Sequence, residues 1–361
     1  MSKKNKIVED LIRPEIQKMA AYHVPEATGL IKLDAMENPF PWPKVMKDEW
    51  LQLLSNVEPN RYPDPSAREL ITGLRDCFDV PAELGVVLGN GSDELIQLIL
   101  MAMKDRSAVI APTPSFVMYQ HIANSLGLPF TGVPLNEDFS LNMSAMKAAI
   151  KQEDPAVIFL SYPNNPTANL FDDDDLIQIL ELANGIVVID EAYQPFACKT
   201  FMNRTPDFKN LLVMRTVSKL GLAGLRLGFV VGHPCLTDEL EKIRLPYNIN
   251  VFTQLTATFA FKHIDTLNQQ AAVIREQRER LLSGLTSFTG VKVFPSDANF
   301  ILFSLLSDSA ERVFEQLKQA GVLIKKMASN PGLPAECLRV TVGTRSENDL
   351  FIEKFASILK Q

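Results

Sequence analysis

The sequence predicts an α/β fold in which a mainly parallel sheet is sandwiched by helices and is followed by a smaller α+β part. Five short apolar runs in the middle of the chain are continuous rather than alternating, at residues 108–110, 157–160, 186–189, 211–214 and 229–231. Such runs are typical of strands that are buried on both faces. Helical patterns, such as the one at residues 176–182, separate several of them, as in repeated strand–helix units.

The segments around this sheet have other patterns. The N-terminal segment is rich in proline and too short to fold alone, so we expect it to pack against the rest. The acidic run Asp172–Asp175 should open a helix, because carboxylates favour the positive end of the helix dipole. An amphipathic stretch at about residues 266–285 should lead into the C-terminal part. There we expect strands at residues 291–294, 300–303, 322–325 and 338–342, and helices at 309–319 and 346–359.

Composition excludes several classes of protein. A length of 361 residues allows two domains. A net charge of −7 does not favour binding to nucleic acid or to a membrane surface. No apolar run approaches the ~18 residues that a membrane-spanning helix needs. The N-terminus is polar and acidic, unlike a signal peptide, and the four cysteines lack the spacing of a disulfide framework or zinc site. We therefore expect a cytoplasmic protein without a metal.

Lys219 follows one of the apolar runs, directly after Thr216 and Ser218, and precedes a glycine-rich stretch that contains Arg226. A lysine in this place can form a Schiff base with the aldehyde of pyridoxal 5′-phosphate (PLP), while the hydroxyls and the guanidinium hold a phosphate. Once a substrate amine has displaced it, the lysine amine can move the proton at the substrate Cα. A surface lysine after a strand is the alternative interpretation.

Asp190 ends another predicted strand at the carboxyl edge of the sheet, where α/β proteins bind their ligands. A carboxylate against the pyridine nitrogen keeps that nitrogen protonated and makes the ring an electron sink. Tyr193, three residues further on, could donate a hydrogen bond to the cofactor O3′. A helix-capping aspartate and a core tyrosine are the structural alternatives.

Two turns follow further strands. The turn at residues 161–167 contains Asn165, which could also donate to O3′, and the Asn165–Pro166 bond could be cis; a plain turn explains this composition nearly as well. The turn at residues 89–94 opens a helix, so its N–H groups, including those of Ser92 and Asp93, could bind a phosphate. It lacks the third glycine of a dinucleotide fingerprint. Taken alone, it would permit a non-enzymatic nucleotide-binding domain.

Phe116 and Arg339 complete the candidate site. Phe116 follows a strand and could stack on the cofactor ring, or it could be a core aromatic residue. Arg339 lies in an otherwise apolar strand, where a guanidinium needs a partner. An anionic substrate group would suit it, because guanidinium binds carboxylate and phosphate with two hydrogen bonds. A structural ion pair is the alternative.

Together these motifs resemble the fold-type I PLP-dependent transferases and, among them, the histidinol-phosphate aminotransferase family. The resemblance covers almost the whole chain, in the segments 33–39, 60–64, 89–94, 162–167, 218–228 and 338–345. Met36, Phe40 and Ala168 stand where the family often has asparagine, tyrosine and glycine, and Lys325 or Lys326 replaces a common arginine. These departures leave the cofactor residues untouched.

The resemblance implies a role for each candidate residue. Lys219 would hold the cofactor, Asp190 its nitrogen, and Tyr193 with Asn165 its O3′. The phosphate would lie among Ser92, Asp93, Thr216, Ser218 and Arg226. The substrate would contact Tyr22, Asn165, Arg339 and, across a dimer interface, Tyr62 of the neighbouring subunit.

The resemblance also implies a large PLP-binding domain at residues 46–260, a small domain built from residues 1–45 and 261–361, and a homodimer with shared active sites. The reaction would be amino transfer between L-histidinol phosphate plus 2-oxoglutarate and imidazole acetol phosphate plus L-glutamate, in histidine biosynthesis. An aminotransferase for aromatic amino acids and a PLP decarboxylase for a phosphorylated amino acid remain open as alternatives.

Overall fold

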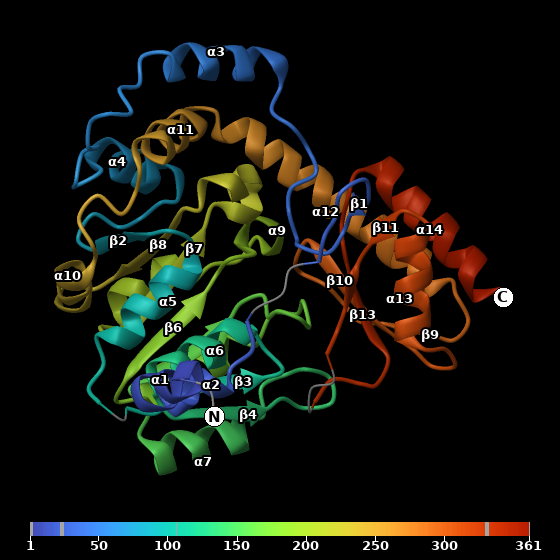
Figure 1. Cartoon of the computed structure of the whole chain (residues 1–361), viewed down its shortest axis with the longest axis horizontal. Coiled ribbons are helices and arrows are strands. Elements are labelled where there is room, and N and C mark those ends of the chain that lie inside the picture. Colours follow the sequence, from blue (N-terminus) through green and yellow to red (C-terminus); the bar gives the residue numbers. More distant parts are fainter. Residues whose placement is uncertain (1–2, 22–24, 106, 329–331, 361) are drawn as a thin grey trace.

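The computed structural model describes residues 3–21, 25–105, 107–328 and 332–360. A seven-stranded sheet and a four-stranded sheet lie side by side in Figure 1, and the long helix α12 (Ile264–Thr286) runs from one to the other. A third, two-stranded pairing joins the N-terminal segment to the C-terminal part. The expected α/β fold with a smaller α+β part is confirmed. The domain boundaries at residues 46 and 260 stay a prediction.

The seven-stranded sheet has the order β2-β8-β7-β6-β5-β3-β4. Its strands are β2 (Gly85–Gly89), β3 (Val109–Thr113), β4 (Phe130–Pro134), β5 (Val157–Ser161), β6 (Ile186–Asp190), β7 (Leu211–Thr216) and β8 (Gly228–Gly232). Strands β3 to β7 pair in parallel, whereas β8 runs antiparallel to both of its neighbours. The connection from Thr216 to Gly228 is too short for the helical crossover that two parallel strands need. For this reason β8 runs antiparallel to β7.

Both faces of this sheet are buried, which explains the continuous apolar runs. In β5, Val157 and Phe159 belong to a hydrophobic cluster on one face, and Ile158 and Leu160 belong to a cluster on the other. The first face is covered by α5 (Ser92–Met101), α6 (Val117–Leu126) and α10 (Pro234–Ile243). The second is covered by α4 (Arg68–Cys77), α7 (Met143–Glu153), α8 (Asp173–Leu182) and α11 (Val251–Lys262). Asp172 caps α8, as the acidic run predicted.

The four-stranded sheet is antiparallel, with the order β12-β13-β10-β9. It contains β9 (Val291–Val293), β10 (Phe300–Leu305), β12 (Lys325–Lys326) and β13 (Cys337–Thr341), and it packs with α13 (Ala310–Gln319) and α14 (Arg345–Leu359). The strand expected at residues 322–325 is interrupted. Its first part is β11 (Val322–Leu323), which pairs in parallel with β1 (Ile31–Lys32), and only Lys325–Lys326 joins the larger ladder.

The N-terminal segment touches several parts of the molecule. Helices α1 (Lys3–Leu11) and α2 (Pro14–Lys18) lie beside α6, where the Arg13 guanidinium donates to the backbone oxygen of Ser125. Helix α3 (Lys44–Leu54) packs on α11, and Trp50 Nε1 donates to Thr256 Oγ1 over 2.9 Å. Short helical turns complete the chain: α9 (Gln194–Ala197), η1 (Met202–Asp207), η2 (Ser218–Leu222) and η3 (Ala223–Leu225). None of the helices described here is long and apolar enough to cross a membrane.

Candidate active site

The carboxyl ends of the parallel strands and the turn before α5 surround a cavity of about 110 Å³. All ten residues that the sequence analysis assigned to the cofactor line this one cavity: Ser92, Asp93, Phe116, Asn165, Asp190, Tyr193, Thr216, Ser218, Lys219 and Arg226. Met36, Ser161 and Ala192 line it as well. Residues that are far apart in sequence therefore meet where α/β folds usually bind ligands.

Lys219 lies in the short π-helical turn η2, directly after the end of β7. Its Nζ donates to the backbone oxygen of Ala35 over 3.1 Å. Burial, with a contribution from the positive charge of Arg339, lowers the pKa of Lys219 to about 8. An amine with this pKa is neutral far more often at pH 7 than an exposed lysine, so Lys219 is suited to attack an aldehyde.

Asp190 is buried at the end of β6, and two donors hold its carboxylate. Tyr119 Oη donates to Oδ2 over 2.7 Å, and the backbone N–H of Ala192 donates to Oδ1 over 3.0 Å. Burial raises the pKa of Asp190 to about 6, and the hydrogen bond from Tyr119 opposes this rise. At neutral pH, Asp190 is therefore a carboxylate that lines the cavity and is held in one orientation by these two donors.

Asn165 connects the cavity to the four-stranded sheet. Its Nδ2 donates to Tyr193 Oη over 3.0 Å, and its Oδ1 accepts a hydrogen bond from Arg339 Nη1. Arg339 also donates from Nη2 to the backbone oxygen of Asp34 over 3.1 Å, and it lies 5.1 Å above the ring of Phe300. The Asn165–Pro166 bond is cis, as the sequence analysis anticipated. This chain of contacts places a guanidinium beside the tyrosine hydroxyl.

The opposite end of the cavity has the features of an anion site. Gly91 has φ +82° and precedes α5, and a Cβ there would lie only 2.8 Å from Arg226 Nη2. Arg226 Nη2 lies 3.4 Å from Asp93 Oδ2, and Thr216 Oγ1 lies 2.8 Å from Ser218 Oγ. A helix N-terminus, two hydroxyls and a guanidinium together can hold a phosphate.

Among the predicted substrate residues that the structure describes, Asn165 lines this cavity, Arg339 contacts Asn165 from outside the lining, and Tyr62 does not line it. Tyr62 is 79% exposed and stacks on Tyr247, with the ring centroids 4.4 Å apart. It is absent from the residues that line the cavity of its own chain. Tyr22 lies outside the residues that the structure describes. Both assignments stay predictions.

Two comparisons with known proteins show the family of this chain. Residues 28–355 match the family model of aminotransferases class I and II. The chain belongs to this family of aminotransferases. A protein named histidinol-phosphate aminotransferase 2 from Nitrosococcus oceani is 51% identical over 96% of each chain.

Two solved structures show how widely this aminotransferase fold is used. The crystal structure of histidinol-phosphate aminotransferase from Sinorhizobium meliloti in complex with pyridoxal-5′-phosphate has a TM-score of 0.86 at 20% identity, over 97% of this chain and 98% of that one. L-threonine-O-3-phosphate decarboxylase from Porphyromonas gingivalis has a TM-score of 0.78 at 22% identity, over 92% of this chain and 100% of that one. The fold alone therefore does not select the reaction.

Met36 and Ser161, which line the cavity of this aminotransferase, and Tyr119, which contacts Asp190, were not among the predicted site residues. Tyr119 stands three residues after Phe116 on α6, and this spacing puts both rings on one helix face. That signal was available in the sequence. Met36 comes from the distant N-terminal segment and has φ +54°, and no sequence pattern places it in the cavity.

Proposed function

We propose that this aminotransferase binds PLP through Lys219 and transfers the amino group between L-histidinol phosphate plus 2-oxoglutarate and imidazole acetol phosphate plus L-glutamate, a step of histidine biosynthesis. The substrate assignment rests on the 51% identity, over nearly the whole chain, to a relative named for this reaction. The four cysteines are free thiols, which agrees with the reducing cytoplasm as the place of action.

The chemistry of the cavity fits PLP. Lys219 would hold the aldehyde carbon, Asp190 would accept a hydrogen bond from the pyridine nitrogen, and Phe116 would cover the ring. The hydroxyls of Thr216 and Ser218, the Arg226 guanidinium and the N-terminus of α5 would hold the phosphate. When bound, the cofactor supplies an electron sink for negative charge at the substrate Cα.

The residues of the chain would orient the reactants and move the proton. Tyr193 and Asn165 already form a hydrogen-bonded pair, and we propose that they hold the cofactor O3′. After the substrate amine has displaced it, Lys219 would take the proton from the substrate Cα with Nζ. It would then donate this proton to the cofactor C4′. Its lowered pKa lets this nitrogen accept and release a proton near neutral pH. The Asp190 carboxylate would keep the ring nitrogen protonated throughout.

Arg339 and Lys325 would hold the anionic end of the substrate. In the β12–β13 ladder, Lys325 stands opposite Arg339 and Lys326 stands opposite Leu338. Opposed residues of an antiparallel pair project from the same face. Lys325 therefore shares the face of Arg339, whereas Lys326 reaches Glu311 on α13. This register favours Lys325 as the residue that takes the place of the family arginine.

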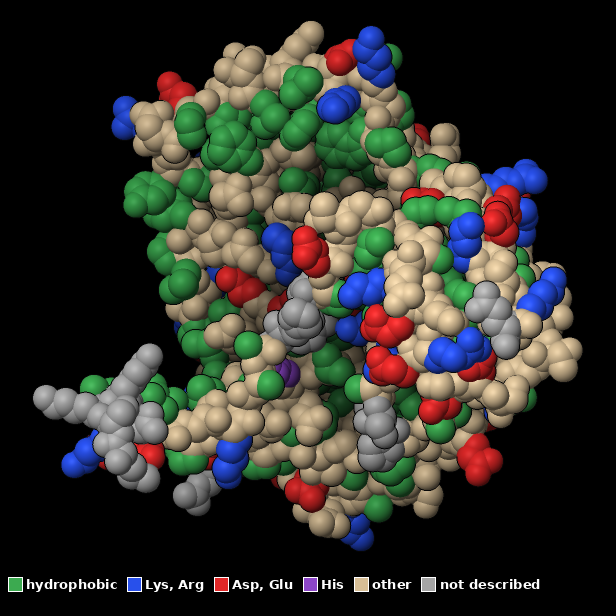
Figure 2. Space-filling view, turned by 45° about the vertical axis from the view of Figure 1, so that its right-hand side comes forward, with side chains coloured by type: hydrophobic (Ala, Val, Ile, Leu, Met, Phe, Trp, Pro, Cys, Tyr) green, Lys and Arg blue, Asp and Glu red, His purple; other side chains and the backbone are tan. Residues whose placement is uncertain are grey.

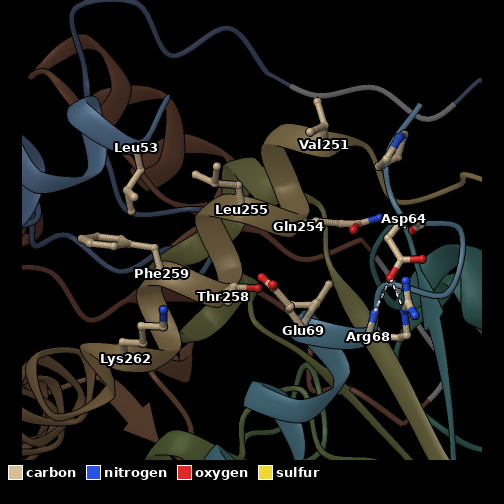
Figure 3. A pocket seen from close by; sticks show the side chains of 12 residues that line it. Leu53, Asp64, Arg68, Glu69, Val251, Gln254, Leu255, Thr258, Phe259 and Lys262 are labelled. Atoms are coloured by element: carbon tan, nitrogen blue, oxygen red, sulfur yellow. Dashed lines mark hydrogen bonds and ion pairs between the residues drawn. The ribbon is translucent and has the colours of Figure 1, made fainter. Parts of the chain in front are cut away.

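The homodimer belongs to the same proposal. Figure 2 shows hydrophobic side chains gathered on the upper part of the molecule, where α3 and α11 lie in Figure 1. Exposed apolar side chains there include Val45, Leu51 and Phe252. Nearby, a wider cavity of about 520 Å³ lies between α3, α4 and α11, with Leu53, Leu255 and Phe259 along one side (Figure 3). An exposed apolar face of this kind is typical of a protein interface.

Steady-state kinetics with the purified protein would test the proposed function. Reconstitution with PLP should produce a visible absorbance band, and turnover of L-histidinol phosphate should require 2-oxoglutarate. A kcat/KM for phenylalanine equal to that for histidinol phosphate would instead identify an aromatic aminotransferase. Release of carbon dioxide from a phosphorylated amino acid without 2-oxoglutarate would identify a decarboxylase.

A further inference from the structure

Tyr119 is a fully buried tyrosine outside the expected cofactor residues, yet it contacts two of them. Its hydroxyl donates to Asp190 Oδ2 over 2.7 Å, and its ring meets the ring of Phe116 edge-on at 5.5 Å. On the other side it stacks on Phe159 of β5, with the ring centroids 4.6 Å apart and the planes 7° apart. This packing leaves the ring no freedom to turn the hydroxyl away from Asp190.

The hydroxyl opposes the effect of burial on Asp190. A carboxylate without water is destabilised, and each directed donor restores part of the lost solvation. The charged and titratable groups that interact with Asp190, apart from Tyr119, include Asp93 on α5, the adjacent Glu191, and Tyr193. Both carboxylates raise the pKa of Asp190. Without Tyr119, the backbone N–H of Ala192 would be the one remaining donor that the described contacts give this carboxylate.

We propose that Tyr119 is a positioning residue whose hydroxyl keeps Asp190 ionised and aimed at the cofactor nitrogen. The inference rests on the proposed function, because the aim of Asp190 matters only if PLP occupies this cavity. Tyr119 is not among the residues that line the cavity. It acts through Asp190 and, by ring contact, on Phe116.

Tyr119→Phe tests the hydroxyl because it keeps the ring and removes one oxygen. Tyr162→Phe is a matched control. Tyr162 is also a buried tyrosine whose hydroxyl donates to a carboxylate, Asp173 Oδ1, over 2.6 Å, but it packs on the other face of the sheet. Both variants lose one hydrogen bond to an acid, so a general loss of stability should affect both.

The first measurement needs no cofactor. Infrared difference spectra of the cofactor-free protein, with Asp190→Asn as the blank, give the pH midpoint at which the Asp190 carboxyl loses its proton. Tyr119→Phe should raise this midpoint by about one pH unit, since one hydrogen bond to a charged group is worth about that much. Tyr162→Phe should leave it unchanged. Incorporation of 3-fluorotyrosine at position 119 makes the hydroxyl a stronger donor and should shift the midpoint downward, even if the phenylalanine variant folds poorly.

The second measurement uses the PLP-loaded protein. A more basic Asp190 draws the proton away from the ring nitrogen, so the ring is less positive and the nitrogen bonded to Lys219 holds its proton more tightly. The pH midpoint of the cofactor absorbance should therefore rise in Tyr119→Phe and not in Tyr162→Phe. Unchanged Asp190 midpoints in both position-119 variants would overturn the inference. Absence of a cofactor band in the wild-type protein would overturn the proposed function instead.

Discussion

Lys325 stands directly opposite Arg339 in the β12–β13 ladder, so the two cationic side chains leave the sheet on the same face. Lys325→Ala should therefore raise KM for L-histidinol phosphate about tenfold, the effect of losing one charge-assisted contact. Turnover at saturating substrate should change little, because Lys325 is not among the residues that line the cavity around Lys219. Steady-state kinetics at constant ionic strength would measure both parameters.

Lys326→Ala is the matched control for Lys325→Ala. Lys326 is the next residue, carries the same charge and pairs with Glu311 at the surface. Its removal should leave KM near the wild-type value, because exposed ion pairs contribute little. If Lys326→Ala raised KM more than Lys325→Ala, the substrate phosphate would lie on the other face of the sheet.

Lys219 should combine with PLP in a pH-dependent manner. Its pKa of about 8 is lowered by burial, and only the neutral amine attacks an aldehyde. The rate at which cofactor-free protein acquires the absorbance band should rise with pH, with a midpoint near pH 8. Stopped-flow mixing with PLP at a series of pH values would measure this rate. A midpoint near that of an ordinary lysine, about 10.4, would contradict the role of burial.

Removal of the amine should abolish turnover. Lys219→Ala should lower kcat by roughly 10³-fold or more, because it removes both the covalent attachment and the proton carrier. The fold should persist, since among the described residues the side chain makes one hydrogen bond, to the backbone oxygen of Ala35. Circular dichroism would check the fold, and borohydride reduction followed by peptide mapping should find the label at Lys219 in the wild-type protein.

Sequence reasoning recovers the cofactor end of the site better than the substrate end, for a physical reason. The residues expected around PLP sit at strand ends and helix starts, and the parallel sheet brings all such ends to one edge. Apolar runs and glycine-rich turns reveal those positions. Lys219, Asp190 and Asn165 are predictable for this reason, and all three line the cavity.

The substrate end depends on contacts that carry no local signal. The sequence could not choose between Lys325 and Lys326, because an interrupted strand shifts which of them opposes Arg339. Met36 lines the cavity from the N-terminal segment, and its backbone N–H donates to Thr341 Oγ1 in the C-terminal part over 3.0 Å, a contact between residues far apart in sequence. The apolar run of β8 could not show the direction of the strand, since a buried strand is apolar whichever way it runs.

Asp190→Asn should separate cofactor binding from turnover. The asparagine keeps the shape but cannot hold the ring nitrogen protonated, so PLP should remain bound while kcat falls by roughly 10²-fold or more. Equilibrium dialysis and single-turnover kinetics would measure the two effects. An unchanged kcat would exclude the electron-sink role of Asp190.

The same variant should change the pH dependence of stability in the cofactor-free protein. The folded-state pKa of Asp190, about 6, lies above its unfolded value, so its stabilising contribution is present in full below about pH 4 and is lost as pH rises through 6. Relative to Asp190→Asn, the wild-type free energy of unfolding should therefore fall by roughly 3 kcal/mol between pH 4 and pH 7. Urea unfolding of both proteins at several pH values would measure this difference. A constant difference would mean that Asp190 keeps an ordinary pKa.

Tyr62 should act in the active site of the neighbouring subunit if the proposed homodimer forms. It is 79% exposed and lies outside the cavity of its own chain. Tyr62→Ala and Lys219→Ala should each impair turnover. When the two variants are mixed, dissociated and reassociated, half of the dimers are mixed, and each mixed dimer has one intact site. Activity should then recover to about a quarter of the wild-type value, as random pairing in a twofold dimer requires. No recovery, with size-exclusion chromatography showing that mixed dimers form, would place Tyr62 in the site of its own chain.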